Sequence, residues 1–302
     1  MKKKVVIVGG VAGGATASAR LRRLDEDLEI VVFERGDHIS FANCGLPYYI
    51  GGTIKEKGKL LVQTVKGMSE RYRLDIRIKS EVIGINRKEK YVEVRNIETG
   101  EIYREVYDVL LLSPGASPIV PNFKSVSGNL KVFTLRTIPD AEEILNYIEK
   151  NNPKTAVVVG GGFIGLEMTE NLKERGLEVI LVEVSDQVQP AVDYEIACIV
   201  HSHLREKGIK IFLQDSVSKL EKTKITLQSG KLIEADMLII SVGVQPENDL
   251  AVRSGLEIGE KGTIKVNEYL QTSDENIYAI GDAIEVKNYL TGSPTHIPLA
   301  WP

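Results

Sequence analysis

Cysteine is scarce in this sequence: among 302 residues only Cys44 and Cys198 occur. Neither belongs to a Cys-x-x-Cys motif, and the residue five positions after Cys44 is Tyr49. Such usage excludes a disulfide framework and fits a reducing compartment. If Cys44 is reactive, its sulfur must therefore bond to an external partner, such as a small-molecule thiol, a sulfane sulfur or oxygen.

Long apolar runs and an excess of basic charge are also missing. No run approaches the roughly 20 residues that a membrane span needs, and 38 basic residues stand against 42 acidic ones. We therefore predict neither a membrane nor a nucleic acid as partner. The N-terminal lysines and the apolar stretch after them resemble a signal peptide, but four of the six residues from Gly9 to Gly14 are glycine. Because these glycines interrupt the apolar core, we predict a cytoplasmic protein.

Glycine, by contrast, is concentrated in two turns that follow apolar strands. Residues 5–8 lead to the first turn and residues 156–159 to the second, and a helical segment follows each turn. A further apolar run comes after each helix and ends at an acid, Glu34 in the first copy and Glu183 in the second. Each copy is therefore predicted to be a βαβ unit with buried parallel strands.

These turns have the chemistry of dinucleotide sites. Glycines let the backbone approach a pyrophosphate at a helix N-terminus, and the acid can accept hydrogen bonds from ribose hydroxyls. Gly160, Gly162 and Gly165 match the Gly-x-Gly-x-x-Gly pattern, whereas Val11 holds the middle glycine position of the first turn. Either turn alone could be a plain βα connection, but two copies with correctly placed acids favour nucleotide binding. The charge of Glu183 favours NAD over NADP, because it repels a 2′-phosphate.

The repeat continues beyond the turns. Residues 108–115 and 236–243 are similar almost position by position, and each follows alternating strands and a turn. The proline-rich residues 115–121 indicate the first crossover between the halves. The predicted fold class is therefore α/β, with two Rossmann-like domains of parallel sheet, helices and β-meander, the second inserted into the first. The predicted boundaries are 1–115 and 250–302 for the first domain and 116–249 for the second.

Two further features point to chemistry. Residues 276–280 form a short apolar strand before Gly281-Asp282, and a carboxylate at the end of a strand can bind a polyol, although a turn aspartate is equally compatible. Cys44 lies between Ser40-Phe41-Ala42-Asn43 and Gly45-Leu46-Pro47-Tyr48. The alternative for Cys44 is a small buried apolar residue, the usual environment of cysteine.

Together these motifs resemble the FAD-dependent pyridine nucleotide-disulfide oxidoreductases. The resemblance covers essentially the whole chain. It is strongest to the single-cysteine branch, which contains coenzyme A disulfide reductases, NADH-dependent persulfide or polysulfide reductases, and NADH oxidases and peroxidases. The resemblance implies two cofactors, FAD in the first domain and NADH in the second.

The resemblance also implies roles for individual positions. For FAD they are Gly9, Val11, Ala12, Gly13, Gly14, Glu34, Arg35, Ser113, Pro114, Gly115, Gly281 and Asp282. For NADH they are Gly160, Gly162, Phe163, Ile164, Gly165, Glu167, Glu183 and Gly243. Substrate-facing positions in coenzyme A-using relatives correspond to Arg20, Arg23, Ser40 and Asn43. Arg20 and Arg23 are three apart, hence on one helix face, and suit phosphates, although a solvated basic face has the same spacing.

The activity implied is transfer of electrons from NADH through FAD to Cys44, with Asn43 as a second catalytic candidate that can donate a hydrogen bond. The acceptor would be coenzyme A disulfide, a persulfide or a polysulfide. Two alternatives stay open: an NADH oxidase or peroxidase that cycles through a Cys44 sulfenic acid, and a catalytically incomplete nucleotide-binding fragment.

The end of the sequence carries a further expectation. In relatives, residues matching Pro298-Leu299-Ala300-Trp301 open a helix against the flavin and a dimerisation domain follows, so we expect that domain to be absent here and a homodimer for longer relatives. Cys198 is predicted to be a core residue of a helix without chemistry. His201 and His203 are two apart and face different sides of a helix, so we predict no metal site.

Overall fold

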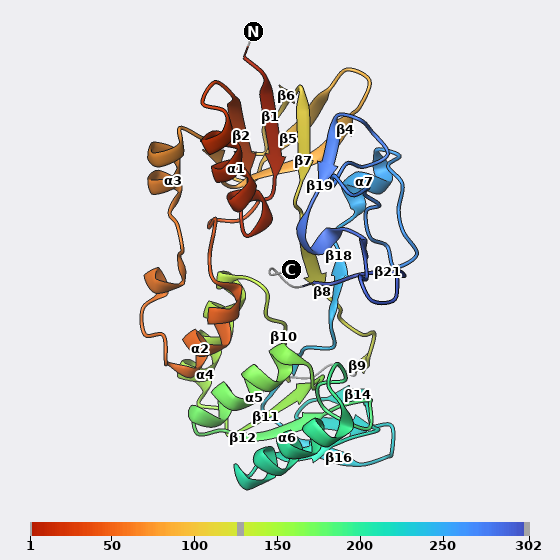
Figure 1. Ribbon diagram of the computed structural model, residues 1–302. Coiled ribbons are helices and arrows are strands. Elements are labelled where there is room, and N and C mark those ends of the chain that lie inside the picture. Colours follow the sequence, from red (N-terminus) through yellow and green to blue (C-terminus); the bar gives the residue numbers. More distant parts are fainter. Residues whose placement is uncertain (1, 126–129, 299–302) are drawn as a thin grey trace. The chain divides into compact units, whose positions relative to one another are not determined.

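The computed structural model describes residues 2–125 and 130–298 (Figure 1). The chain forms two compact units. The first contains Met1–Phe41, Leu61–Ser117 and Gln245–Pro302, and the second contains Ala42–Leu60 and Pro118–Val244. Both units are α/β, and the second is inserted into the sequence of the first, which confirms the predicted fold class.

The segment Ala42–Leu60, which carries Cys44, differs from the predicted division. The prediction puts it in the first domain, but it packs with the second unit. Its helix α2 (Leu46–Gly51) contacts α4 (Ile138–Asn151) and α5 (Phe163–Glu174). Leu46 and Ile50 are almost fully buried in this packing, because they occupy one face of the short helix.

The first unit contains a five-stranded parallel sheet, and its strand order places the N-terminal strand in the middle. In spatial order the strands are β19 (Ile277–Ala279), β7 (Val109–Leu112), β1 (Lys4–Val8), β2 (Glu29–Phe33) and β3 (Asp75–Arg77). Alternate residues of each strand point to opposite faces, so Val5 and Ile7 pack with helices while Val6 and Val8 pack with another sheet.

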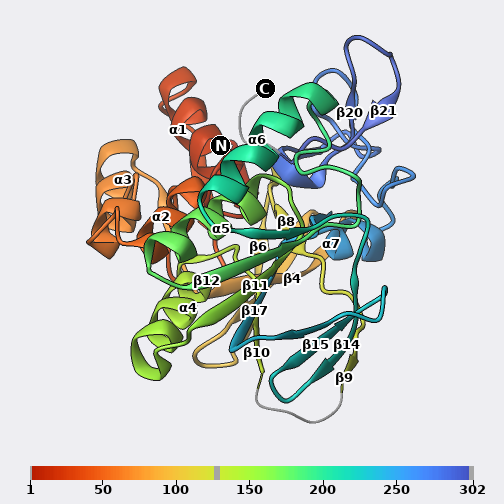
Figure 2. The same ribbon diagram turned by 90° about the horizontal axis from the view of Figure 1, so that it is seen from below.

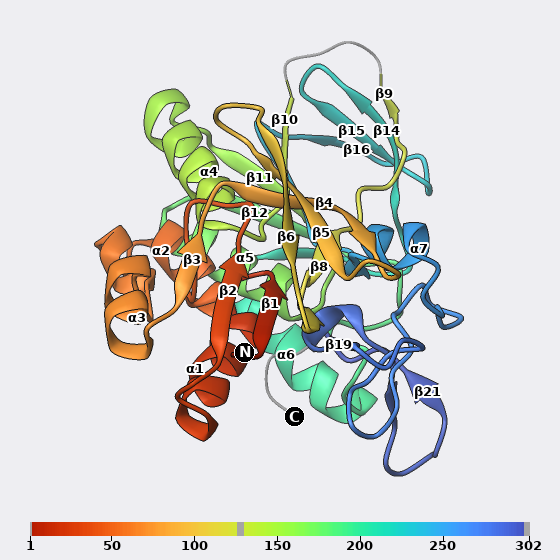
Figure 3. The same cartoon turned by 90° about the horizontal axis from the view of Figure 1, so that it is seen from above.

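Helices and a meander cover the two faces of this sheet. On one face lie α1 (Gly13–Leu24) and α3 (Val65–Tyr72), whose apolar side chains join those of β1 and β2; Figure 3 shows α3 beside β3. On the other face lies the antiparallel meander of β4 (Ser80–Asn86), β5 (Tyr91–Asn96) and β6 (Ile102–Val106). The unit also contains α7 (Asp249–Arg253) and a hairpin of β20 (Val286–Lys287) and β21 (Pro294–Thr295).

The second unit repeats this plan. Its parallel sheet has the order β10 (Lys131–Phe133), β17 (Met237–Ile240), β11 (Thr155–Val159), β12 (Glu178–Val182) and β13 (Lys210–Phe212). A smaller sheet contains β16 (Leu232–Glu234), β15 (Lys224–Leu227), β14 (Val217–Glu221) and β9 (Lys124–Ser125), with β9 beside β14 (Figure 2). Its apolar side chains pack on β11 and β12. This unit also contains α6 (Tyr194–Glu206).

The two crossovers between the units pair with each other as β8 (Ala116–Pro118) and β18 (Val244–Pro246). Helix α4 follows β10 and begins at a capping box. The Thr137 side chain accepts the N–H of Asp140, and the Asp140 carboxylate accepts the N–H of Thr137 at 2.8 Å. Such a box stabilises the first turn of a helix. Within the described residues, none of the helices combines the length and the apolar character that a membrane span requires.

Candidate functional site

The first glycine-rich turn connects β1 to α1 by a close approach of backbones. Gly9 has φ +97°, and a Cβ placed on it would lie 2.1 Å from the carbonyl oxygen of Ser113. A Cβ on Gly14 would lie 1.8 Å from the carbonyl oxygen of Gly9. Because no side chain fits at either position, the strand and the first turn of the helix can meet only through glycine.

Glu34 follows β2 and holds this turn. Its carboxylate is buried and accepts the N–H of Gly10 at 2.8 Å and the N–H of Gly36 at 2.7 Å. Each carboxylate oxygen keeps a further lone pair. The Glu34 carboxylate can therefore still accept hydrogen bonds from ribose hydroxyls, as predicted. It also holds the backbone of the turn in place, which the sequence pattern does not reveal.

The second turn repeats this geometry between β11 and α5. Gly160 has φ +103°, and a Cβ on Gly165 would lie 1.8 Å from the Gly160 carbonyl oxygen. Glu183 is buried and accepts the N–H of Gly161 at 2.5 Å and of Ser185 at 2.8 Å. Gly162 differs from the others, because a Cβ there would meet no protein atom within 4 Å. This open space beside a helix N-terminus fits a bound pyrophosphate.

The remaining predicted nucleotide positions lie mostly where strands end. Ser113, Pro114 and Gly115 follow β7, Gly243 follows β17, and Gly281 and Asp282 follow β19. The carboxyl ends of parallel strands are where α/β sheets bind ligands. Val11 and Ala12 lie in the first glycine turn. Phe163 and Ile164 begin α5, and the side chain of Phe163 is largely exposed. Arg35 forms an ion pair with Glu247 at 3.3 Å. Leu299–Trp301 lie outside the described residues.

Cys44 lies in a short 3₁₀ turn, Asn43–Gly45, directly before α2. Its thiol is free and exposed, so the alternative of a small buried apolar residue is wrong. The Asn43 amide donates to the carbonyl oxygen of Arg136 at 3.4 Å, and no hydrogen bond to Cys44 from Asn43 is found among the described residues. The catalytic role of Asn43 stays a prediction.

Helix α2 is fastened to α5 at its C-terminal end. The Nε of Arg175 donates to the carbonyl oxygen of Ile50 at 2.6 Å. Gly51 lies so close to α5 that a Cβ on it would be 2.0 Å from the Oδ1 of buried Asn171. The segment that begins with Cys44 is therefore held on the helix that follows the second glycine turn.

Two side chains between α2 and α5 have raised pKa values. Burial raises the pKa of the Tyr48 phenol, and the charges of Glu167, Glu170 and Cys44 raise it further. Burial, and then the charge of Glu170, raises the pKa of the Glu167 carboxyl. Tyr48 therefore remains a neutral phenol near Cys44 throughout the physiological range.

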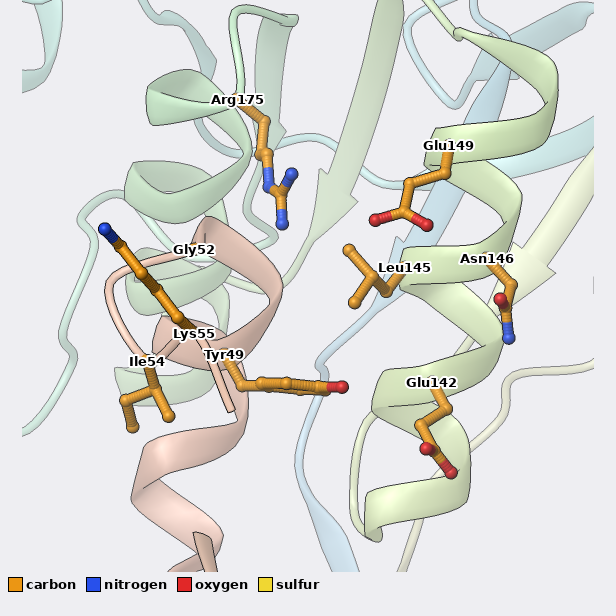
Figure 4. Close-up of a pocket in the computed structure, with 9 residues that line it drawn as sticks. All are labelled: Tyr49, Gly52, Ile54, Lys55, Glu142, Leu145, Asn146, Glu149 and Arg175. Carbon is orange, nitrogen blue, oxygen red and sulfur yellow. The ribbon is translucent and has the colours of Figure 1, made fainter. Parts of the chain in front are cut away.

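A cavity of about 540 Å³ lies beside Arg175, which binds the carbonyl of Ile50 (Figure 4). Tyr49, Ile54 and Lys55 from the α2 segment, with Arg175 from the end of α5, form one wall. The α4 side chains Glu142, Leu145, Asn146 and Glu149 form the other. Because Nε of Arg175 is bonded to a carbonyl at the C-terminus of α2, the guanidinium acts there as a helix cap.

Substitution of Arg175 by alanine is expected to weaken the attachment of α2 to α5, because it removes the hydrogen bond to Ile50. The lost hydrogen bond has a charged donor, so the free energy of unfolding should fall by about 1.5–3 kcal/mol, and amide exchange should accelerate in α2. Urea unfolding and hydrogen exchange by mass spectrometry measure both effects. Lys55→Ala is the matched control, since Lys55 is an exposed cation on the same wall. Equal exchange in both variants would contradict the assigned capping role.

The predicted substrate arginines lie on α1, and both are exposed. The guanidinium of Arg23 lies 5.9 Å from the ring centre of Tyr72, and that of Arg71 lies 5.3 Å from the same ring. Arg71 was not found by sequence reasoning, because only the fold brings α3 beside α1. Ser40 has φ +44°, and its backbone is held by hydrogen bonds to Gly10 and from residues 62 and 63.

Two other expectations concern α6. Cys198 is half-buried rather than a core residue, and its interaction with the Tyr194 phenol raises the pKa of that phenol. The expectation of a core position fails because α6 buries a different face, with Ala197, His201 and Leu204. His201 accepts the N–H of Val188 at 3.1 Å, and burial lowers its pKa.

The family description that matches residues 3–301 is pyridine nucleotide-disulphide oxidoreductase. The chain belongs to this family. The coenzyme A disulfide reductase of Staphylococcus haemolyticus is 37% identical over 299 residues, which make up 99% of this chain and 67% of that protein. Membership confirms the resemblance found in the sequence and the prediction of an FAD- and NAD-dependent oxidoreductase.

Two solved structures resemble this oxidoreductase over nearly its whole length. Reduced CoADR-RHD of Bacillus anthracis is 56% identical, with a TM-score of 0.98, over 100% of this chain and 55% of the other. The NAD-dependent persulfide reductase of A. fulgidus is 36% identical, with a TM-score of 0.94, over 98% of this chain and 56% of the other. The oxidoreductase thus spans little more than half the length of these two proteins.

Proposed function

We propose that this oxidoreductase passes electrons from NADH through FAD to Cys44, which reduces a small-molecule disulfide, persulfide or polysulfide in the cytoplasm. The observation that carries the proposal is the free, exposed Cys44 thiol in a chain with two glycine turns of the nucleotide-binding kind. The only other cysteine of the sequence, Cys198, lies on α6 and is half-buried. An external sulfur compound is therefore the proposed partner of Cys44.

The chemistry of the glycine turns supports the proposed cofactor sites. In the first unit, Glu34 and Asp282 are the proposed ligands of the FAD hydroxyls, with the Gly9–Gly14 turn at its pyrophosphate. In the second unit, Glu183 and the turn around Gly162 are the proposed site for NADH. When bound, these groups supply two electrons, as hydride from the nicotinamide and through the flavin ring.

The proposed role of Cys44 is nucleophilic. As a thiolate, its Sγ attacks one sulfur of the substrate disulfide, the S–S bond breaks, and one thiol leaves after taking a proton. Two electrons that originate from NADH then break the mixed disulfide on Cys44, the second thiol takes a proton, and the thiolate is restored. One NADH and one proton from solvent thus convert one disulfide to two thiols. The neutral Tyr48 phenol lies near this sulfur and is available as a hydrogen-bond donor.

Coenzyme A disulfide is the proposed first choice of substrate. The exposed cations Arg23 of α1 and Arg71 of α3 lie over the ring of Tyr72, and Arg20 is exposed on α1 as well. Guanidinium groups bind phosphates through two parallel hydrogen bonds. The relative from S. haemolyticus carries the name of a coenzyme A disulfide reductase. Contacts of Ser40 and Asn43 with the substrate are part of the same proposal.

Anaerobic titration with NADH, followed by candidate acceptors, tests the proposed function. The flavin absorbance should bleach with one equivalent of NADH and recover fastest with coenzyme A disulfide or polysulfide. Fastest recovery with peroxide or oxygen would instead identify an oxidase or peroxidase. Failure of the bound flavin to bleach would identify a nucleotide-binding protein without this activity.

A further inference from the structure

The turn that follows β19 has an unusual arrangement of carbonyl groups. Three residues, Gly281 to Ala283, form a short 3₁₀ turn that begins with φ +77° at Gly281. The carbonyl oxygen of Gly281 accepts the N–H of Ile284 at 3.2 Å, and that of Ala283 accepts the N–H of Ile264 at 2.7 Å. Both bonds come from backbone groups in the core of the first unit.

The middle carbonyl, that of Asp282, is bound by a side chain instead. The Nε2 of His296 lies 2.7 Å from the Asp282 carbonyl oxygen. A carbonyl oxygen only accepts, so Nε2 carries the proton and donates, in either the neutral or the charged imidazole. His296 is half-buried at this contact.

The β20–β21 hairpin lies between Asp282 and His296 in sequence and brings His296 back to the Gly281–Ala283 turn. Strands β20 and β21 pair antiparallel through Val286↔Thr295 and Lys287↔Pro294, and the N–H of Asn288 donates to the carbonyl oxygen of Ser293 at 2.9 Å. His296 comes directly after β21, where the chain has returned to the level of the turn. The contact is therefore a product of the hairpin, not of sequence proximity.

We propose that His296 is a positioning residue for flavin binding, acting through Asp282. This rests on the proposed role of Asp282 as a ligand of the FAD polyol. A planar trans peptide points its C=O and N–H in opposite directions, so the bond from His296 fixes the plane between Asp282 and Ala283 and thereby the backbone of Asp282. Without this donor the peptide plane loses one of the contacts that hold it, and the direction of the Asp282 carboxylate is less tightly fixed.

The test is FAD titration of apoprotein, followed by flavin fluorescence quenching. His296→Leu, which removes the donor at similar size, should raise the Kd for FAD about three- to tenfold, the worth of one net hydrogen bond. His296→Gln, which can place an N–H donor near the same point, should restore the Kd to within about twofold. Tyr289→Ala is the matched control, because that side chain is 98% exposed on the same hairpin.

The outcomes separate the two proposals. If Asp282→Ala leaves the Kd for FAD unchanged, the proposed flavin role of Asp282 is wrong. If Asp282→Ala weakens FAD but His296→Leu does not, the inference about His296 is overturned. It is also overturned if His296→Gln is as weak as His296→Leu, or if His296→Leu weakens NADH binding by the same factor as FAD binding, since that would indicate a general loss of structure.

Discussion

Replacing Cys44 with serine is expected to abolish the reduction of coenzyme A disulfide by NADH. A hydroxyl cannot form the mixed disulfide, and losing a covalent nucleophile removes at least about 4 kcal/mol of transition-state stabilisation, or about a thousandfold in rate. Because Cys44 is exposed, the serine variant should fold normally, bind FAD and be bleached by NADH as before. Alkylation and mass spectrometry measure the thiols released from the disulfide, and flavin absorbance measures the reduction of FAD by NADH.

Cys198→Ser is the matched control for this variant. Cys198 is half-buried on α6, and serine is close to cysteine in size. Its thiol production should stay within about twofold of the unaltered protein, as for a surface change away from the chemistry. Thiol release that survives in Cys44→Ser, or disappears in Cys198→Ser, would remove Cys44 from the proposed reaction.

The parallel strands could be predicted from the sequence because their signals are local. A buried parallel strand needs a continuous apolar run, and a close strand-to-helix turn needs glycine. The predicted run at residues 29–33 is β2 itself, and the run at 178–182 is β12. The predicted repeat corresponds to a shared strand order, with β7, β1, β2 and β3 in one unit matched by β17, β11, β12 and β13 in the other.

The partner of the cysteine segment could not be predicted in the same way. Residues 42–60 lie between two parts of the first unit in sequence, yet they pack on the second. The cause is a set of distant contacts, in which Gly51 leaves room for Asn171 and Arg175 binds the carbonyl of Ile50. Apolar periodicity identifies which face of α2 is buried but carries no information on which helix covers it.

In the candidate site, too, local motifs predict some residues, whereas contacts between residues distant in sequence appear only in the fold. The acids Glu34 and Glu183 were predicted from their positions at strand ends, but their bonds to Gly10 and Gly161 appear only once each strand lies beside the turn. His296 carries no sequence signal, because the hairpin alone brings it to Asp282. Motifs therefore predict residues for contact with a ligand, and the fold shows the backbone and side-chain contacts that hold those residues in place.

We expect the two glycine turns to lose the binding of their proposed nucleotides independently when Gly14 or Gly165, near the start of the following helix, is replaced by alanine. In Gly165→Ala the new Cβ would lie 1.8 Å from the carbonyl oxygen of Gly160, so α5 must move away from β11. We expect NADH affinity to fall at least about a hundredfold, a loss of about 2.7 kcal/mol, while the protein stays yellow with FAD. Gly14→Ala has the same clash with Gly9 and should be colourless while still binding NADH. Absorbance and calorimetric titration with NADH measure the two losses.

Gly162→Ala separates the effect of the ligand space from the effect of the clash. Its added Cβ would meet no atom within 4 Å beyond those of its chain neighbours, so the thermal unfolding midpoint should fall by no more than the loss of a glycine N-cap on α5 costs. If a pyrophosphate occupies that space, the methyl group must still weaken NADH, by about tenfold or about 1.4 kcal/mol. Gly58→Ala, equally free of neighbours but in the short 3₁₀ helix Lys57–Leu60 after α2, should change neither quantity. Unaltered NADH affinity in Gly162→Ala would place the nucleotide elsewhere, because a ligand in contact with that backbone has no room for the added methyl group.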